Sequence, residues 1–130
     1  MRTIVRFCVA VSFFLCGIAS RLCATELTEG EAVRALEKAV QFFRKEVSAQ
    51  GGYLWRYSQD LSKREGEGKA GPLTAWVQPP GTPTVGDGYL EAYRLSGKPF
   101  LLEAARETGL ALVRGQLRSG GWDYRIEFDP

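Results

Sequence analysis

The predicted fold is decided by the stretch Gln50-Gly51-Gly52-Tyr53-Leu54-Trp55-Arg56-Tyr57 of this 130-residue chain. A second version of it, Ser119-Gly120-Gly121-Trp122-Asp123-Tyr124-Arg125, follows 69 residues later, counted from Gly51 to Gly120. Each version follows an amphipathic segment, turns at two glycines and continues into alternating aromatic and polar residues. A unit repeated in this way is typical of arrays in which neighbouring units bury each other's faces. The alternative is two unrelated helix ends, each followed by core aromatics.

A first amphipathic helix is predicted before the first glycine pair. Thr28 and Glu31 have the spacing of a capping box, in which each side chain binds the other residue's backbone N–H. Apolar residues then recur every three or four positions, which places them on one helix face: Val33, Leu36, Val40, Phe43 and Val47. Gly51 and Gly52 are expected to end this helix.

Two further helices are predicted between the two glycine pairs. One begins at Thr82 or Thr84 and runs to about Ser96, with Gly97 as its stop. The next begins at Pro99, because proline is tolerated in the first helical turn, and ends near Arg118.

Long loops are predicted between the first and second helices. Residues 58–71 are charged and rich in glycine, which indicates a surface loop. Residues 76–83 contain three prolines, which exclude a regular helix and favour a stiff loop. Because long loops in compact proteins are more often functional than idle, these two are the first places to look for a site.

The first 24 residues have the pattern of a secretory signal peptide. Residues 1–6 form a basic lead, residues 7–18 an apolar run, and the small residues Ala19 and Ala24 are candidate cleavage positions. The apolar run is too short for a comfortable bilayer span, which needs roughly 20 residues. We therefore expect an exported protein, periplasmic or extracellular, with its folded domain at residues 25–130. An uncleaved N-terminal anchor is the alternative.

Removal of residues 1–24 changes the charge and the redox chemistry. The three cysteines of the chain, Cys8, Cys16 and Cys23, all lie in this segment. So do three arginines, which leaves 14 of the 17 basic residues against 15 acidic ones. Such a chain is held together by core packing rather than by disulfides. Its near-neutral charge favours neither a nucleic acid nor a membrane as a partner.

The chain contains no histidine. This excludes a Ser-His-Asp triad, a Cys-His dyad, a histidine general base and a histidine-ligated zinc site within it. Any chemistry must therefore use carboxylates, Arg, Lys or Tyr, with oxygen ligands for any metal ion.

The second glycine turn carries the first family resemblance. Gln116-Leu117-Arg118-Ser119-Gly120-Gly121-Trp122 fits the Q-x-x-x-G-x-W repeat of the α/α-toroid terpenoid cyclases. Three longer strings, taken in order, resemble the N-terminal portion of bacterial pectate lyases (pectic acid lyases) of polysaccharide lyase family 10. They are residues 51–57, the string Trp76-Val77-Gln78-Pro79-Pro80-Gly81-Thr82-Pro83, and residues 119–124. The resemblance covers roughly residues 29–130.

The resemblance implies a fold and an activity. The fold would be all-α, a partial α/α toroid of helical hairpins with long aromatic and Pro-Gly loops. The activity would be β-elimination of α-1,4-linked galacturonan (pectate), with calcium bridging substrate carboxylates and an arginine abstracting the C5 proton. The family's catalytic arginine and calcium-binding aspartates match no position here. We expect them in sequence beyond Pro130, which would make this chain the N-terminal part of a longer protein.

Candidate substrate contacts lie in the aromatic strings. Trp55, Tyr57 and Trp76 are possible platforms for sugar rings, because the apolar faces of sugars pack on aromatic rings. Arg56 has the geometry to bind a uronate carboxylate with two hydrogen bonds. The alternative for the aromatics is core filling, which we prefer for Tyr53 and Trp122. The alternative for Arg56 is a surface salt bridge.

Four carboxylates are possible oxygen ligands for calcium: Asp60, Glu65, Glu67 and Asp87. Their spacing matches no known metal loop, so a solvated run of charge is the preferred interpretation.

Three alternatives to a lyase stay open. One is a carbohydrate-binding or scaffold protein with the aromatic loops but no catalysis. Another is a terpenoid-cyclase-like toroid, although its acidic D-x-D-D motif is absent and Asp123 and Asp129 do not supply it. The third is a gene fragment whose product does not fold stably.

Overall fold

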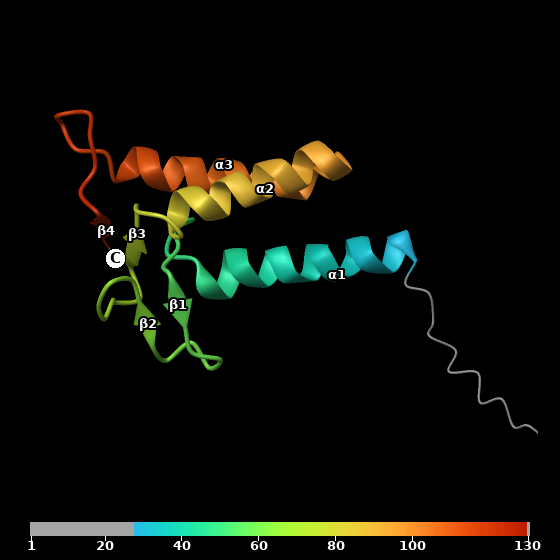
Figure 1. Cartoon of the computed structure of the whole chain (residues 1–130), viewed down its shortest axis with the longest axis horizontal. Helices are drawn as coiled ribbons and strands as arrows, with labels where there is room; N and C mark the ends of the chain where they lie inside the picture. The colour runs from blue at the N-terminus through green and yellow to red at the C-terminus, as the bar shows by residue number, and fades with distance from the viewer. Residues whose placement is uncertain (1–27, 130) are drawn as a thin grey trace, which may run out of the picture.

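The computed structural model describes residues 28–129, so the predicted signal peptide lies outside the described residues (Figure 1). The elements follow one another in this order: α1 (Glu29–Phe42), the π-helical turn η1 (Phe43–Val47), β1 (Arg56–Tyr57), β2 (Arg64–Glu65), β3 (Thr74–Trp76), α2 (Thr82–Ser96), α3 (Pro99–Arg114) and β4 (Arg125–Glu127).

The start of α1 and the end of α2 confirm the local signals in the sequence, and the end of α3 does not. At the start of α1 the backbone N–H of Glu31 donates to Thr28 Oγ1 at 3.2 Å, and that of Thr28 donates to Glu31 Oε2 at 2.9 Å. The capping box is therefore complete. Helix α2 ends at Gly97, which has a left-handed φ of 66°. Helix α3 ends at Arg114 rather than near Arg118.

The prediction of an all-α partial toroid is wrong. Within residues 28–129 the fold is mixed, with helices and two small antiparallel sheets, β1–β2 and β3–β4. The physical reason is that short stretches between and after the predicted helices pair along their backbones. In the β3–β4 sheet Ala75 lies opposite Ile126, and both side chains are buried.

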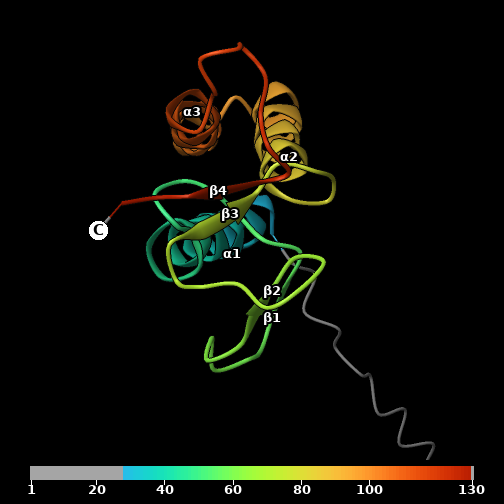
Figure 2. The same ribbon diagram turned by 90° about the vertical axis from the view of Figure 1, so that its left-hand side faces the viewer.

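The two sheets lie at one end of the helices (Figures 1 and 2). Helices α2 and α3 pack side by side as a hairpin, and α1 lies beside them. The β3–β4 sheet lies between the α2–α3 hairpin and the β1–β2 hairpin (Figure 2). The main core cluster is formed by Val40, Val47, Tyr53, Tyr89, Leu101, Ala104 and Ala105.

The expected core roles of Tyr53 and Trp122 differ in outcome. Tyr53 is 1% exposed, which confirms the expectation, whereas Trp122 is 44% exposed. The indole N–H of Trp122 donates to the carbonyl of Leu112 at 2.8 Å. Trp122 therefore donates a hydrogen bond to a backbone carbonyl near the end of α3 instead of filling the core.

Candidate functional site

The β1–β2 hairpin carries two of the predicted site residues, Arg56 and Tyr57. Its strands pair Arg56 with Glu65 and Tyr57 with Arg64. The backbone N–H of Trp55 extends this pairing by donating to the Glu65 carbonyl at 3.1 Å. The backbone pairing of the two strands thus fixes the positions from which the side chains of Arg56 and Tyr57 extend.

Asp60 fixes the loop that joins the two strands. Its Oδ1 accepts hydrogen bonds from the hydroxyls of Ser58 at 2.6 Å and Ser62 at 2.8 Å, and from the backbone N–H of Ser62 at 3.1 Å. The hydrogen bonds from the two serines lower the pKa of Asp60 to about 2. This carboxylate, one of the four considered for calcium, is engaged in shaping the loop.

A hollow of about 240 Å³ lies on the hairpin, lined by Arg56, Tyr57, Ser58, Lys63 and Glu65. Arg56 Nη2 lies 3.0 Å from Glu65 Oε2, so the surface salt bridge considered for Arg56 is present. The Arg56 side chain is nevertheless 71% exposed. Because the hollow has two cations and one carboxylate, it carries a net positive charge.

Tyr57 borders this hollow but is itself held in the structure. Its hydroxyl accepts a hydrogen bond from the Leu54 N–H at 2.7 Å, and burial raises the pKa of this hydroxyl. The Arg64 guanidinium lies over the Tyr57 ring, 5.7 Å from its centroid. Arg64 also donates to the carbonyls of Val47 at 3.0 Å and Glu46 at 3.3 Å, which ties the hairpin to the end of η1.

Three aromatic rings form a row beside the hairpin. The Trp76 centroid lies 5.8 Å from that of Trp55 and 5.4 Å from that of Tyr124. We call these three residues the aromatic row. The indole N–H of Trp55 donates to the Gln78 carbonyl at 3.1 Å, and that of Trp76 to the Gln78 side-chain oxygen at 3.2 Å. Gln78 therefore fixes both tryptophans.

Trp76 is the buried centre of the aromatic row. It is 3% exposed, and a Cβ placed on Gly66 would lie 2.3 Å from its ring, so the hairpin backbone covers that face. A buried ring supports its neighbours instead of offering a face to a ligand. Trp55 is half-buried and Tyr124 is 47% exposed.

The structure brings only some of the predicted site residues together. Trp55 and Trp76 are in contact, whereas Tyr57 lines the hollow of the hairpin together with Arg56. Arg56 pairs with Glu65. Sequence reasoning did not select Lys63 or Tyr124. The pairing of the strands that places Lys63 in the hollow has no local sequence signal, whereas Tyr124 belongs to the repeated string.

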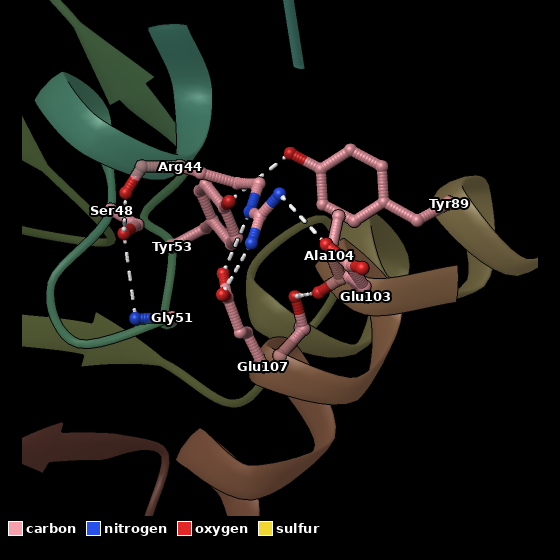
Figure 3. A network of polar contacts seen from close by, with 9 residues as sticks. Arg44, Ser48, Gly51, Tyr53, Tyr89, Glu103, Ala104 and Glu107 are labelled. Atoms are coloured by element: carbon pink, nitrogen blue, oxygen red, sulfur yellow. Dashed lines mark hydrogen bonds and ion pairs between the residues drawn. The ribbon is translucent and has the colours of Figure 1, made fainter. Parts of the chain in front are cut away.

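A second polar network joins η1, the 48–53 turn, α2 and α3 (Figure 3). Arg44 binds Glu107 with two hydrogen bonds, Nε to Oε2 at 2.9 Å and Nη2 to Oε1 at 2.5 Å, and lies 3.8 Å from Glu103. Beside this pair the hydroxyls of Tyr53 and Tyr89 lie 3.1 Å apart. The network thus connects segments that are more than 30 residues apart in the chain.

The protonation of this network does not suit a general base. A base must be able to lose its proton, but Glu107 raises the pKa of Arg44 by accepting its hydrogen bonds. Burial raises the pKa of Tyr53 and of Tyr89. All three groups hold their protons, and the hydrogen bonds from Arg44 lower the pKa of Glu107, which makes this carboxylate a weaker base.

The Arg44–Glu107 pair predicts a loss of stability in acid. Its hydrogen bonds lower the folded-state pKa of Glu107 below 4.5, so the unfolded chain binds more protons on acidification. The contribution is fully present above about pH 4.5 and is lost as the pH falls through the folded-state pKa. Because Glu107 is 47% exposed, we expect only about 0.5–1 kcal/mol. Urea unfolding between pH 3 and 7 measures it, and Glu107→Gln should remove this part of the pH dependence.

Calcium binding stays a prediction. Within residues 28–129, no three His, Cys, Asp or Glu side chains lie together in a way that could hold a metal ion. Glu67 and Asp87, two of the four carboxylates considered, are exposed.

None of the helices in the described part of the chain has the length and apolar character needed to cross a membrane.

Comparison of the chain with protein-family models, curated proteins and solved structures found no match in any of the three.

Proposed function

We propose that this chain is an exported, pectate-lyase-like protein that binds an acidic polysaccharide, polygalacturonate, at the β1–β2 hairpin. One observation carries the proposal: Arg56 and Lys63 line the same small hollow, with only the carboxylate of Glu65 among them. The resemblance of residues 51–57, 76–83 and 119–124 to pectate lyases supports the choice of galacturonan as the ligand.

The chemistry of the hollow suits a uronate. Polygalacturonate carries a carboxylate on each sugar, and a guanidinium binds a carboxylate through two parallel hydrogen bonds. The ligand must compete with Glu65 for Arg56. An exposed ion pair of this kind contributes at most about 1 kcal/mol, so its exchange costs little. Binding should weaken with added salt, because the charges involved are exposed.

Removing both cations of the hollow should weaken binding of polygalacturonate. For Arg56→Ala combined with Lys63→Ala we expect a loss of about tenfold or more in affinity, since a hydrogen bond to a charged group contributes about 1.5–3 kcal/mol. Glu65→Gln should have the opposite effect, because it removes the competing carboxylate. Isothermal titration calorimetry at fixed ionic strength measures both changes.

Arg94 offers a matched control for Arg56. Its side chain is also 71% exposed and also pairs with a glutamate, Glu91, at 3.4 Å, but it lies on α2. Arg94→Ala should leave the affinity unchanged. An equal loss at Arg94 and at Arg56 would show that binding follows net charge and would contradict a site at the hairpin.

The elimination chemistry that the resemblance implies has its own test. Unsaturated products absorb near 235 nm, so absorbance is followed while the chain is incubated with polygalacturonate, first with calcium and then with a chelator. We expect binding without a rise, because no residue here matches the family's catalytic arginine or calcium-binding aspartates. A calcium-dependent rise would place base and metal ligands within this chain and would overturn the assignment of binding alone.

A further inference from the structure

Tyr124 is an exposed aromatic residue that does not line the hollow of the hairpin. It precedes β4, is 47% exposed, and packs one side of its ring on the buried Trp76 at an interplanar angle of 51°. Its backbone is fixed on both sides: the carbonyl accepts from the Val77 N–H at 2.8 Å, and the N–H donates to Asp123 Oδ1 at 2.7 Å. Tyr124 is therefore an exposed residue with a fixed backbone, and its ring is supported by Trp76.

Trp55 occupies the other end of the aromatic row. It is half-buried, contacts Trp76 and is fixed by the hydrogen bond from its indole N–H to Gln78. Rings held in this way lose little conformational freedom when a ligand packs on them, which favours binding.

We propose that Tyr124, with Trp55 at the other end of the aromatic row, is a second contact for the polysaccharide, where a sugar ring stacks. This inference rests on the proposed function. Hydrogen-bonding groups next to the rings, the Gln78 amide and the exposed carboxylate of Asp123, suit the hydroxyls of a sugar. The Asp123 carboxylate repels a uronate carboxylate, so this position recognises the ring face and not the charge.

The two contacts recognise different parts of the polysaccharide. The hollow at Arg56 requires a free carboxylate, whereas the stacking position at Tyr124 accepts a sugar whose carboxylate is esterified. A long galacturonan that engages both contacts binds more tightly than either contact alone would allow, because the second contact forms within the complex.

The experiment uses two ligands, polygalacturonate and its fully methyl-esterified form, with affinities measured by isothermal titration calorimetry. We expect Tyr124→Ala to weaken binding of both ligands by about threefold to tenfold, the usual range for the loss of an aromatic stacking partner. Tyr124→Phe keeps the ring and should keep the affinity. Arg56→Ala should weaken binding of polygalacturonate alone. Phe42→Ala, which removes an equally exposed ring from α1, should change neither affinity.

The outcomes separate this inference from the proposed function. If Tyr124→Ala binds both ligands like the unmodified chain while Arg56→Ala loses affinity for polygalacturonate, the stacking position is wrong and the hairpin site stands. If only Tyr124→Ala loses affinity, the hairpin site is wrong and the stacking position stands. If the unmodified chain binds neither ligand, both are wrong. An equal loss in Phe42→Ala would show non-specific apolar adsorption and would also overturn the inference.

Discussion

Replacing Trp76 by alanine is expected to lower the free energy of unfolding by about 3–5 kcal/mol, a large part of the stability of a small domain. Trp76 is 3% exposed and contacts Trp55, Tyr124 and the backbone at Gly66. Removing its indole leaves a cavity between the β1–β2 hairpin and the β3–β4 sheet.

Urea unfolding followed by far-UV circular dichroism measures this loss. Trp122→Ala is the control, because Trp122 is 44% exposed and its removal should cost about 1 kcal/mol or less, chiefly for its hydrogen bond to Leu112. Equal losses in the two variants would contradict the burial of Trp76. Trp76→Ala should also weaken polygalacturonate binding, because Trp55 and Tyr124 lose their common support.

The helices were predictable because their signals are local. The capping box at Thr28 and Glu31, and the stop at Gly97, each act within a few residues. Helix α3 ended earlier than its sequence indicated, with Gly115 as its C-cap, where a Cβ would lie 2.1 Å from the Ile126 side chain. Ile126 belongs to β4, which lies outside the stretch of sequence from which the end of this helix was predicted.

The sheets were not predictable, and this is why the fold class was wrong. Strand β1 lies in the alternating aromatic and polar string of residues 53–57, but it and β2 have only two residues each, too few to indicate which segments pair. Strand β3 has three residues and pairs with β4, so that Ala75 lies opposite Ile126 about 50 positions later. Pairing between such distant segments depends on the whole fold, and neither segment alone shows which partner it takes.

The candidate site was predictable in its residue types and not in their roles. Trp55 and Trp76 were selected because tryptophans beside polar loops suit sugars, and the two are in contact. Trp76 is the covered one of the two, because the fold brings the backbone of Gly66 against its ring. Likewise, Lys63 joins Arg56 through the pairing of β1 with β2.

The second large effect is expected at Gly51, the first glycine of the repeated turn. Its φ of 88° favours glycine, and a Cβ there would lie 2.6 Å from the backbone oxygen of Glu107 on α3. The left-handed conformation costs an alanine about 1–2 kcal/mol, and forcing the turn away from α3 costs about 1–3 kcal/mol more. For Gly51→Ala we therefore expect a loss of about 2–5 kcal/mol, together with a disturbed Arg44–Glu107 pair.

The second copy of the turn supplies the control for this prediction. Gly120 has a φ of 87°, nearly that of Gly51, but a Cβ there would meet no atom within 4 Å. Gly120→Ala should cost only the conformational part, about 1–2 kcal/mol. The difference between the two variants, measured by urea unfolding under one set of conditions, gives the free energy of the close approach of the turn to α3. Equal losses would mean that this approach adapts without cost, and would contradict a tight packing of the turn on α3.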